Sequence, residues 1–179
     1  PSVSSANALL DFWEERIRTV IGNVIFGVDD DTMESVVLGM LADRGLTLAV
    51  AESVTGGLVT GRLTNVPGSS RVLLGGVVSY ASEVKYELLY VTPGPVVSES
   101  AALEMARGVR TALKADVGLS LTGVAGPDEQ DGQPVGTLFV GIATRDGEVS
   151  TSLRLPATRD QMRQMSVISA LDFLRREMS

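Results

Sequence analysis

Two short apolar runs, each followed at once by hydroxyl groups and glycines, constrain the fold of this chain more than any other feature. Residues 46–51 are apolar except for Thr47, which is typical of a strand buried inside a sheet, and residues 116–121, with apolar Val117, Leu119 and Leu121, are also predicted to form a strand. The first run continues into ESVTGG, residues 52–57, and the second into TGVAGP, residues 122–127. Open α/β sheets bind ligands just beyond the carboxyl ends of their strands, so both are candidate binding loops. The residues alone leave open a second interpretation, two ordinary turns that need glycine.

The rest of the chain alternates between helical and strand patterns, which indicates the α/β class. We expect a three-layer α/β/α sandwich around a mixed, mostly parallel sheet. Residues 1–30 are predicted to be an N-terminal helix and linker that join an upstream domain, and residues 31–179 the sheet domain. Further helices are expected over 32–44, 56–64, 83–90, 99–114 and 159–176, and further strands over 72–80, 135–144 and 149–155.

Several of these helices begin at residues that can cap a helix. Gly45 is predicted to end the helix before the first buried strand, and Asp146-Gly147 indicates a hairpin between the last two strands. N-terminal caps are predicted at Asp31 with Glu34, at Ser82, at Ser98, and at Thr158 with Gln161.

The composition excludes several classes of protein. The net charge is −7, with 15 basic and 22 acidic residues, whereas a general nucleic-acid-binding surface is basic. No apolar run approaches the roughly 18 residues of a membrane span, and the N-terminal residues lack the pattern of a signal peptide. We therefore expect a cytoplasmic protein with no nucleic-acid partner and no membrane partner.

The chain contains no histidine and no cysteine. These absences exclude Ser-His-Asp triads, thiolate catalysis, iron–sulfur clusters and every metal site that needs either residue. Acid–base chemistry must then use Asp, Glu, Tyr, Lys or bound water. A metal-dependent hydrolase would need an all-oxygen site such as Asp128, Glu129 and Asp131, a pattern more typical of a solvated loop, so we expect no metal and no cofactor.

Ser53 lies where a strand-to-helix turn can expose a hydroxyl as a nucleophile, provided that a base is near. Glu52 is a weak base toward an alcohol, and a lysine is normally protonated. Lowering a lysine pKa from about 10.4 to about 7 costs roughly 4.6 kcal/mol. Lys85, in the first turn of a predicted helix, would obtain this shift from the helix dipole and mainly from burial, with Tyr80 as a hydrogen-bond partner. On these grounds alone a solvated lysine beside Glu83 remains the simpler interpretation.

Several stretches of the sequence together resemble one family. AESVTGGLVTGRLTNVPGSSRVLLGGVVSYASEVKYELL, DVGLSLTGVAGP and PVGTLFVGIA, in this order, resemble the C-terminal domain of the competence/damage-inducible CinA proteins, the nicotinamide-mononucleotide amidohydrolase (PncC) family. The resemblance covers about residues 32–176, and IGNVIFGVDDDTMESVV resembles the segment that joins this domain to an upstream domain. Two departures are Val54, where many members have cysteine, and ATRDQMR, where the usual pattern is GDR-x-x-R.

The resemblance implies deamidation of nicotinamide mononucleotide to nicotinate mononucleotide and ammonia by a serine–lysine mechanism. The family's nucleophile corresponds to Ser53 and its base to Lys85, with Tyr80 beside the base. The substrate contacts expected here come from the backbone N–H groups of Thr55, Gly56 and Gly57 around an oxyanion, and from Thr122, Gly123, Gly126 and Arg159 around ribose and phosphate.

A second hypothesis is a non-catalytic nucleotide-binding module that serves an upstream domain. The two hypotheses differ in whether Lys85 lies within hydrogen-bond reach of Ser53, or many ångströms away and pointing to solvent. In either case the apolar residues 72–78 and the N-terminal helix favour a homo-oligomer.

Overall fold

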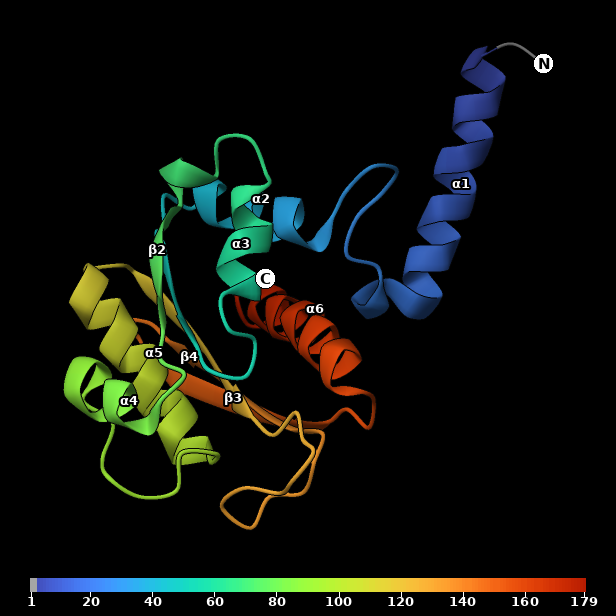
Figure 1. Cartoon of the computed structure of the whole chain (residues 1–179). Coiled ribbons are helices and arrows are strands. Elements are labelled where there is room, and N and C mark those ends of the chain that lie inside the picture. The colour runs from blue at the N-terminus through green and yellow to red at the C-terminus, as the bar shows by residue number, and fades with distance from the viewer. Residues whose placement is uncertain (1–2) are drawn as a thin grey trace.

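The computed structural model describes residues 3–179 and contains one five-stranded mixed sheet (Figure 1). In the sheet the strand order is β2-β1-β3-β4-β5. The strand pairs β1–β2 and β1–β3 are parallel, while β3–β4 and β4–β5 are antiparallel. Only β4 therefore runs against the others, which confirms the mixed, mostly parallel sheet. The strands are β1 (Leu48–Glu52), β2 (Leu73–Val78), β3 (Val117–Gly123), β4 (Thr137–Ala143) and β5 (Glu148–Arg154).

Helices cover both faces of the sheet and so form the three expected layers (Figure 1). On one face lie α2 (Met33–Asp43), α3 (Leu58–Thr64) and α6 (Arg159–Glu177). On the other face lie α4 (Ser82–Leu89) and α5 (Glu99–Leu113). The helix α1 (Val3–Ile21) stands apart from the sheet in Figure 1, and the prediction that it joins an upstream domain stays a prediction. Among residues 3–179, no helix is both long enough and apolar enough to cross a membrane.

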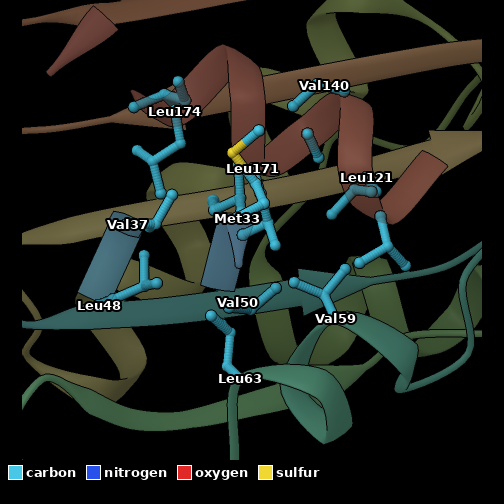
Figure 2. Close-up of a cluster of buried hydrophobic side chains, with 14 of the residues drawn as sticks. Met33, Val37, Leu48, Val50, Val59, Leu63, Leu121, Val140, Leu171 and Leu174 are labelled. Carbon is cyan, nitrogen blue, oxygen red and sulfur yellow. The ribbon is translucent and has the colours of Figure 1, made fainter. Parts of the chain in front are cut away.

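The two faces of the buried strand β1 carry side chains of different size. Leu48 and Val50 point into the larger core, where they meet side chains of α2, α3 and α6 (Figure 2). Ala49 and Ala51 point the other way, toward α5. Small residues let α5 approach the sheet closely, and a methyl group at Gly118 would collide with the backbone of α5 at Ala106.

The caps of α5 and α6 and the hairpin between β4 and β5 confirm the sequence predictions. The hydroxyl of Ser98 accepts the N–H of Ala101 at 3.2 Å. The side chain of Gln161 accepts the N–H of Thr158 at 3.2 Å.

Two other caps were predicted wrongly. The N-cap of α2 is Thr32, which exchanges hydrogen bonds with Ser35, because the buried Glu34 forms an ion pair with the half-buried Arg62. Ser82 is the first residue of α4 and forms no capping bond, since the N-cap position falls on Ala81.

The register of the three parallel strands places their carboxyl ends side by side. Glu52, the last residue of β1, lies between Val78 of β2 and Leu121 of β3. The loops that follow these strands therefore meet at one edge of the sheet, where the sequence predicted a site.

Candidate active site

A small cavity of about 160 Å³ opens at this edge of the sheet. A larger hollow of about 570 Å³ lies at the opposite end of the sheet, around the β4–β5 hairpin, and contains none of the predicted site residues. The smaller cavity is therefore the candidate site. It is lined by Ser53, Val54, Tyr80, Lys85, Val97, Gly123, Val124, Ala125, Gly126, Asp128, Gln130 and Arg159.

Ser53 is held at the end of β1 by the sheet itself. Its N–H donates to the carbonyl of Leu121 at 3.0 Å, and its own carbonyl accepts the N–H of Gly56 at 3.1 Å. The first bond extends the β1–β3 ladder by one residue, and the second closes a tight turn. Ser53 thus lines the cavity from a backbone that is fixed on both sides.

Glu52 caps the helix that follows the turn. Its side chain is completely buried and accepts five hydrogen bonds. Three come from the backbone N–H groups of Gly57, Val59 and Thr60 at 2.8–3.0 Å. These are groups that a helix leaves unpaired at its N-terminus, and the N-cap residue Gly57 has no side chain to satisfy them. The other two come from the hydroxyls of Thr55 and Thr60. With both oxygens occupied, Glu52 is a structural carboxylate and not a base for Ser53.

Lys85 reaches the same cavity from α4. Its side chain is only 1% exposed, which contradicts the simpler interpretation of a solvated lysine. Nζ donates to the carbonyl of Ser79 at 2.8 Å, and the N–H of Ser79 in turn donates to the carbonyl of Glu52 at 2.8 Å. Burial lowers the pKa of Lys85 below its ordinary value, against the opposing charges of Asp131 and Glu83.

Tyr80 and Arg159 form a clasp across the cavity. Arg159 donates through Nη2 to the Tyr80 hydroxyl at 2.6 Å and through Nη1 to the carbonyl of Gly126 at 2.6 Å. The clasp joins the β2–α4 connection, the loop after β3 and the start of α6. The Tyr80 hydroxyl therefore bonds Arg159, whereas Lys85 bonds the neighbouring carbonyl of Ser79.

The turn after Ser53 supplies fewer backbone donors than the sequence suggested. The N–H of Gly56 donates to Ser53 and that of Gly57 to Glu52, so neither is available for an oxyanion. Within residues 3–179 the N–H groups of Val54 and Thr55 have no partner, and Val54 lines the cavity. The expectation for Gly56 and Gly57 is thus corrected, and the candidate donors become Val54 and Thr55.

The side chains of Thr55 and Thr122 have structural roles, which removes Thr122 from the predicted substrate contacts and leaves only the backbone N–H of Thr55 as a candidate. The Thr55 hydroxyl donates to Glu52 at 2.7 Å. The Thr122 hydroxyl is buried and donates to the carbonyl of Val96 at 2.6 Å. Neither side chain lines the cavity, because both are consumed in holding loops together. Gly123, Gly126 and Arg159, in contrast, do line it.

Sequence reasoning missed Arg163, and it missed that Asp131 accepts the N–H groups of Val96 and Val97. Arg163 lies one turn after Arg159 on α6 and donates to the carbonyl of Thr55 at 2.9 Å, so it braces the turn after Ser53. The four-residue spacing between the two arginines is a signal that could have placed both on one face. In the part of the chain that the structure describes, no group of three or more acidic side chains is arranged to hold a metal ion.

Comparison with known proteins places this chain in a family. The CinA C-terminal domain family matches residues 30–178. A CinA-like protein from Frankia casuarinae is 50% identical over 178 residues, which cover 97% of this chain and 41% of that protein. A putative competence-damage inducible protein from Caldanaerobacter subterraneus is 43% identical over 169 residues, or 91% of this chain and 41% of its own length. The chain thus spans about two fifths of these relatives, consistent with an additional domain in them.

Solved structures agree with the sequence relatives. The competence/damage inducible protein CihA from Agrobacterium tumefaciens is 31% identical with a TM-score of 0.76, over 84% of this chain and 96% of that one. A CinA superfamily protein from Klebsiella pneumoniae is 28% identical with a TM-score of 0.79, over 82% of this chain and 95% of that one. The chain therefore belongs to the family of CinA C-terminal domains.

Proposed function

We propose that this domain is an amidohydrolase that converts nicotinamide mononucleotide to nicotinate mononucleotide and ammonia. The observation that carries the proposal is that Ser53 and Lys85 line one small cavity and that Lys85 is buried there with a lowered pKa. Among the described residues no hydrogen bond joins the two side chains, since Nζ of Lys85 donates to the carbonyl of Ser79. A hydroxyl that shares a cavity with an amine of lowered pKa can act as an activated nucleophile when the amine turns to it. The names of the relatives specify no reaction, so the activity rests on this geometry and on the family resemblance of the motifs.

The cavity residues account for each step of an amide hydrolysis. Neutral Lys85 takes the proton of Ser53 while the Ser53 oxygen attacks the carboxamide carbon. The N–H groups of Val54 and Thr55 face the resulting oxyanion. Protonated Lys85 then gives its proton to the leaving nitrogen, ammonia departs, and an ester to Ser53 remains. Water, deprotonated by Lys85, releases the carboxylate and restores the serine.

Arg159 is the proposed partner of the substrate phosphate. A guanidinium carries five N–H donors in a fixed plane, and the contacts to Tyr80 and Gly126 use only two of them. These two contacts hold the plane still, while the remaining donors can meet phosphate oxygens. The backbone of Gly123 and Gly126, close beside it, allows a ribose or phosphate group to approach.

The first test is ammonia release by the purified protein from nicotinamide mononucleotide. Ser53→Ala removes the nucleophile, and we expect kcat to fall about 10³-fold or more with little change in thermal stability. Ser70→Ala, at an exposed serine outside the cavity, is the matched control and should act like the wild type. Full turnover by Ser53→Ala would refute the mechanism. Tight nucleotide binding without ammonia release by the wild type would favour the non-catalytic binding module.

A second test addresses the phosphate. Arg159→Gln removes a charge-assisted contact worth about 1.5–3 kcal/mol, so KM for nicotinamide mononucleotide should rise about 10- to 100-fold. KM for nicotinamide riboside, which lacks the phosphate, should change much less. Arg44→Gln, at an exposed arginine beside the opposite end of the sheet, serves as the control. An equal rise for both substrates would show that Arg159 does not read the phosphate.

The cytoplasmic location, the homo-oligomer and the upstream domain remain predictions from the sequence. Size-exclusion chromatography with light scattering measures the oligomeric state directly.

A further inference from the structure

The loop between β3 and β4 ends in a tight turn. Gln130 and Gln133 exchange two backbone hydrogen bonds, at 3.1 and 2.8 Å. The two residues between them, Asp131 and Gly132, have positive φ angles of 55° and 71°. This is the geometry of a two-residue hairpin turn, for which Asp-Gly is a favoured pair. The polar stretch that the sequence predicted to be a solvated loop is indeed exposed, and it ends in a defined hairpin tip.

The side chain of Asp131 fastens this tip to the wall of the cavity. Its Oδ2 accepts the N–H of Val96 at 2.8 Å and the N–H of Val97 at 2.9 Å. Val97 lines the cavity, and the carbonyl of Val96 accepts the Thr122 hydroxyl from the end of β3. One carboxylate oxygen thus joins the β3–β4 loop to the segment that leads into α5.

The same carboxylate contributes to the electrostatic surroundings of Lys85. Asp131 and, more weakly, Glu83 on α4 act to raise the pKa of Lys85 against the effect of burial. The other charged groups of the cavity wall are Asp128 and Arg159, and Tyr80 is its remaining titratable side chain. Asp131 is the largest single charge effect on the amine.

We propose that Asp131 is a positioning residue of this site, whose carboxylate locks the β3–β4 loop onto residues 96 and 97 and holds a negative charge toward Lys85. The inference rests on the proposed function, because Lys85 is taken as the base. The two roles differ in what they require. The lock needs only a hydrogen-bond acceptor, whereas the effect on Lys85 needs the charge.

Asp131→Asn separates the two roles. The amide oxygen of asparagine can accept the same two N–H groups, and asparagine tolerates a positive φ, but the charge is lost. We expect the rising limb of kcat against pH to move to lower pH, since removing a negative charge lowers the pKa of a nearby amine. Hydrogen exchange of the Val96 and Val97 amides should stay as slow as in the wild type.

Asp131→Gly removes both roles without strain in the backbone, because glycine accepts the positive φ. The amides of Val96 and Val97 should then exchange at least tenfold faster, and KM should rise as the cavity wall loosens.

Two controls complete the set. Glu129→Gln, at the exposed neighbouring residue that does not line the cavity, should change neither readout. Glu83→Gln should move the pH profile in the same direction, by less, and leave the exchange unchanged.

Titration by NMR measures the pKa of Lys85 directly and needs no activity assay. The chain has two lysines, Lys85 and Lys114, so Lys114→Met assigns the remaining signal. An unchanged Lys85 titration in Asp131→Asn, or unchanged exchange of Val96 and Val97 in Asp131→Gly, would overturn the proposal. If the wild type releases no ammonia, while Asp131→Asn still lowers the Lys85 pKa and Asp131→Gly still speeds exchange of Val96 and Val97, only the proposed function is refuted.

Discussion

Replacement of Lys85 by methionine is expected to lower kcat for ammonia release about 10³-fold while leaving the folded protein at least as stable as the wild type. Both parts follow from burial. The amine is the proposed proton acceptor, so its loss removes the activation of Ser53. Yet Lys85 is 1% exposed, and a buried amine is costly to hold in its charged form, whereas methionine fills a similar volume without charge. Loss of activity without loss of stability is the signature of a functional lysine.

The pH dependence gives a second check on Lys85. Desolvation lowers its pKa below 10.5, the ordinary value of the side chain. Because the neutral amine is the active form, activity should rise with pH through an inflection below that value. Lys85→Arg should be inactive over the whole range, since a guanidinium keeps its proton.

Lys114 provides the matched control for this substitution. It is the other lysine of the chain and is exposed at the end of α5, so Lys114→Met makes the same chemical change far from the cavity. Its activity and pH profile should match the wild type. A Lys85→Met enzyme with an unaltered kcat would refute the serine–lysine mechanism.

The strand and helix patterns were readable from the sequence because they depend on local periodicity. The buried runs in β1 and β3 and the Asp-Gly hairpin before β5 each lie within a few residues of the chain. The caps were less readable. Glutamate is a residue type typical of a helix start, but the partner of Glu34 is Arg62, 28 positions further along the chain. Only the packing of α2 against α3 decides between these two uses of the glutamate.

The identity of Ser53 and Lys85 could be proposed from the sequence, but the surroundings of Lys85 could not. Its direct partner is the backbone carbonyl of Ser79, and a carbonyl has no signature in the residue type. Burial of the amine likewise depends on how α4 packs against the sheet. The same limit explains why Gly56 and Gly57 were assigned to an oxyanion: their N–H groups are taken by acceptors that only the folded turn brings near.

Replacement of Glu52 by glutamine is expected to lower the free energy of unfolding by about 3 kcal/mol, the largest stability effect at this site. The carboxylate accepts five hydrogen bonds in a completely buried position. Glutamine keeps one acceptor oxygen and turns an NH₂ group toward groups that are themselves donors, so buried N–H groups at the start of α3 lose their partner. Thermal denaturation should show a fall in Tm of roughly 6–12 °C for a domain of this size.

Thr60→Val is the graded comparison for Glu52, because it removes a single hydroxyl donor and leaves the N–H of residue 60 in place. It should reduce the free energy of unfolding by about 1 kcal/mol. If Glu52 were instead the base for Ser53, Glu52→Gln would keep its stability and lose about 10²–10⁴ in kcat. The structural role predicts the opposite, a Tm that falls and a kcat that is largely retained when the assay is run well below that Tm. An unchanged Tm would therefore contradict the cap and return Glu52 to consideration as the base.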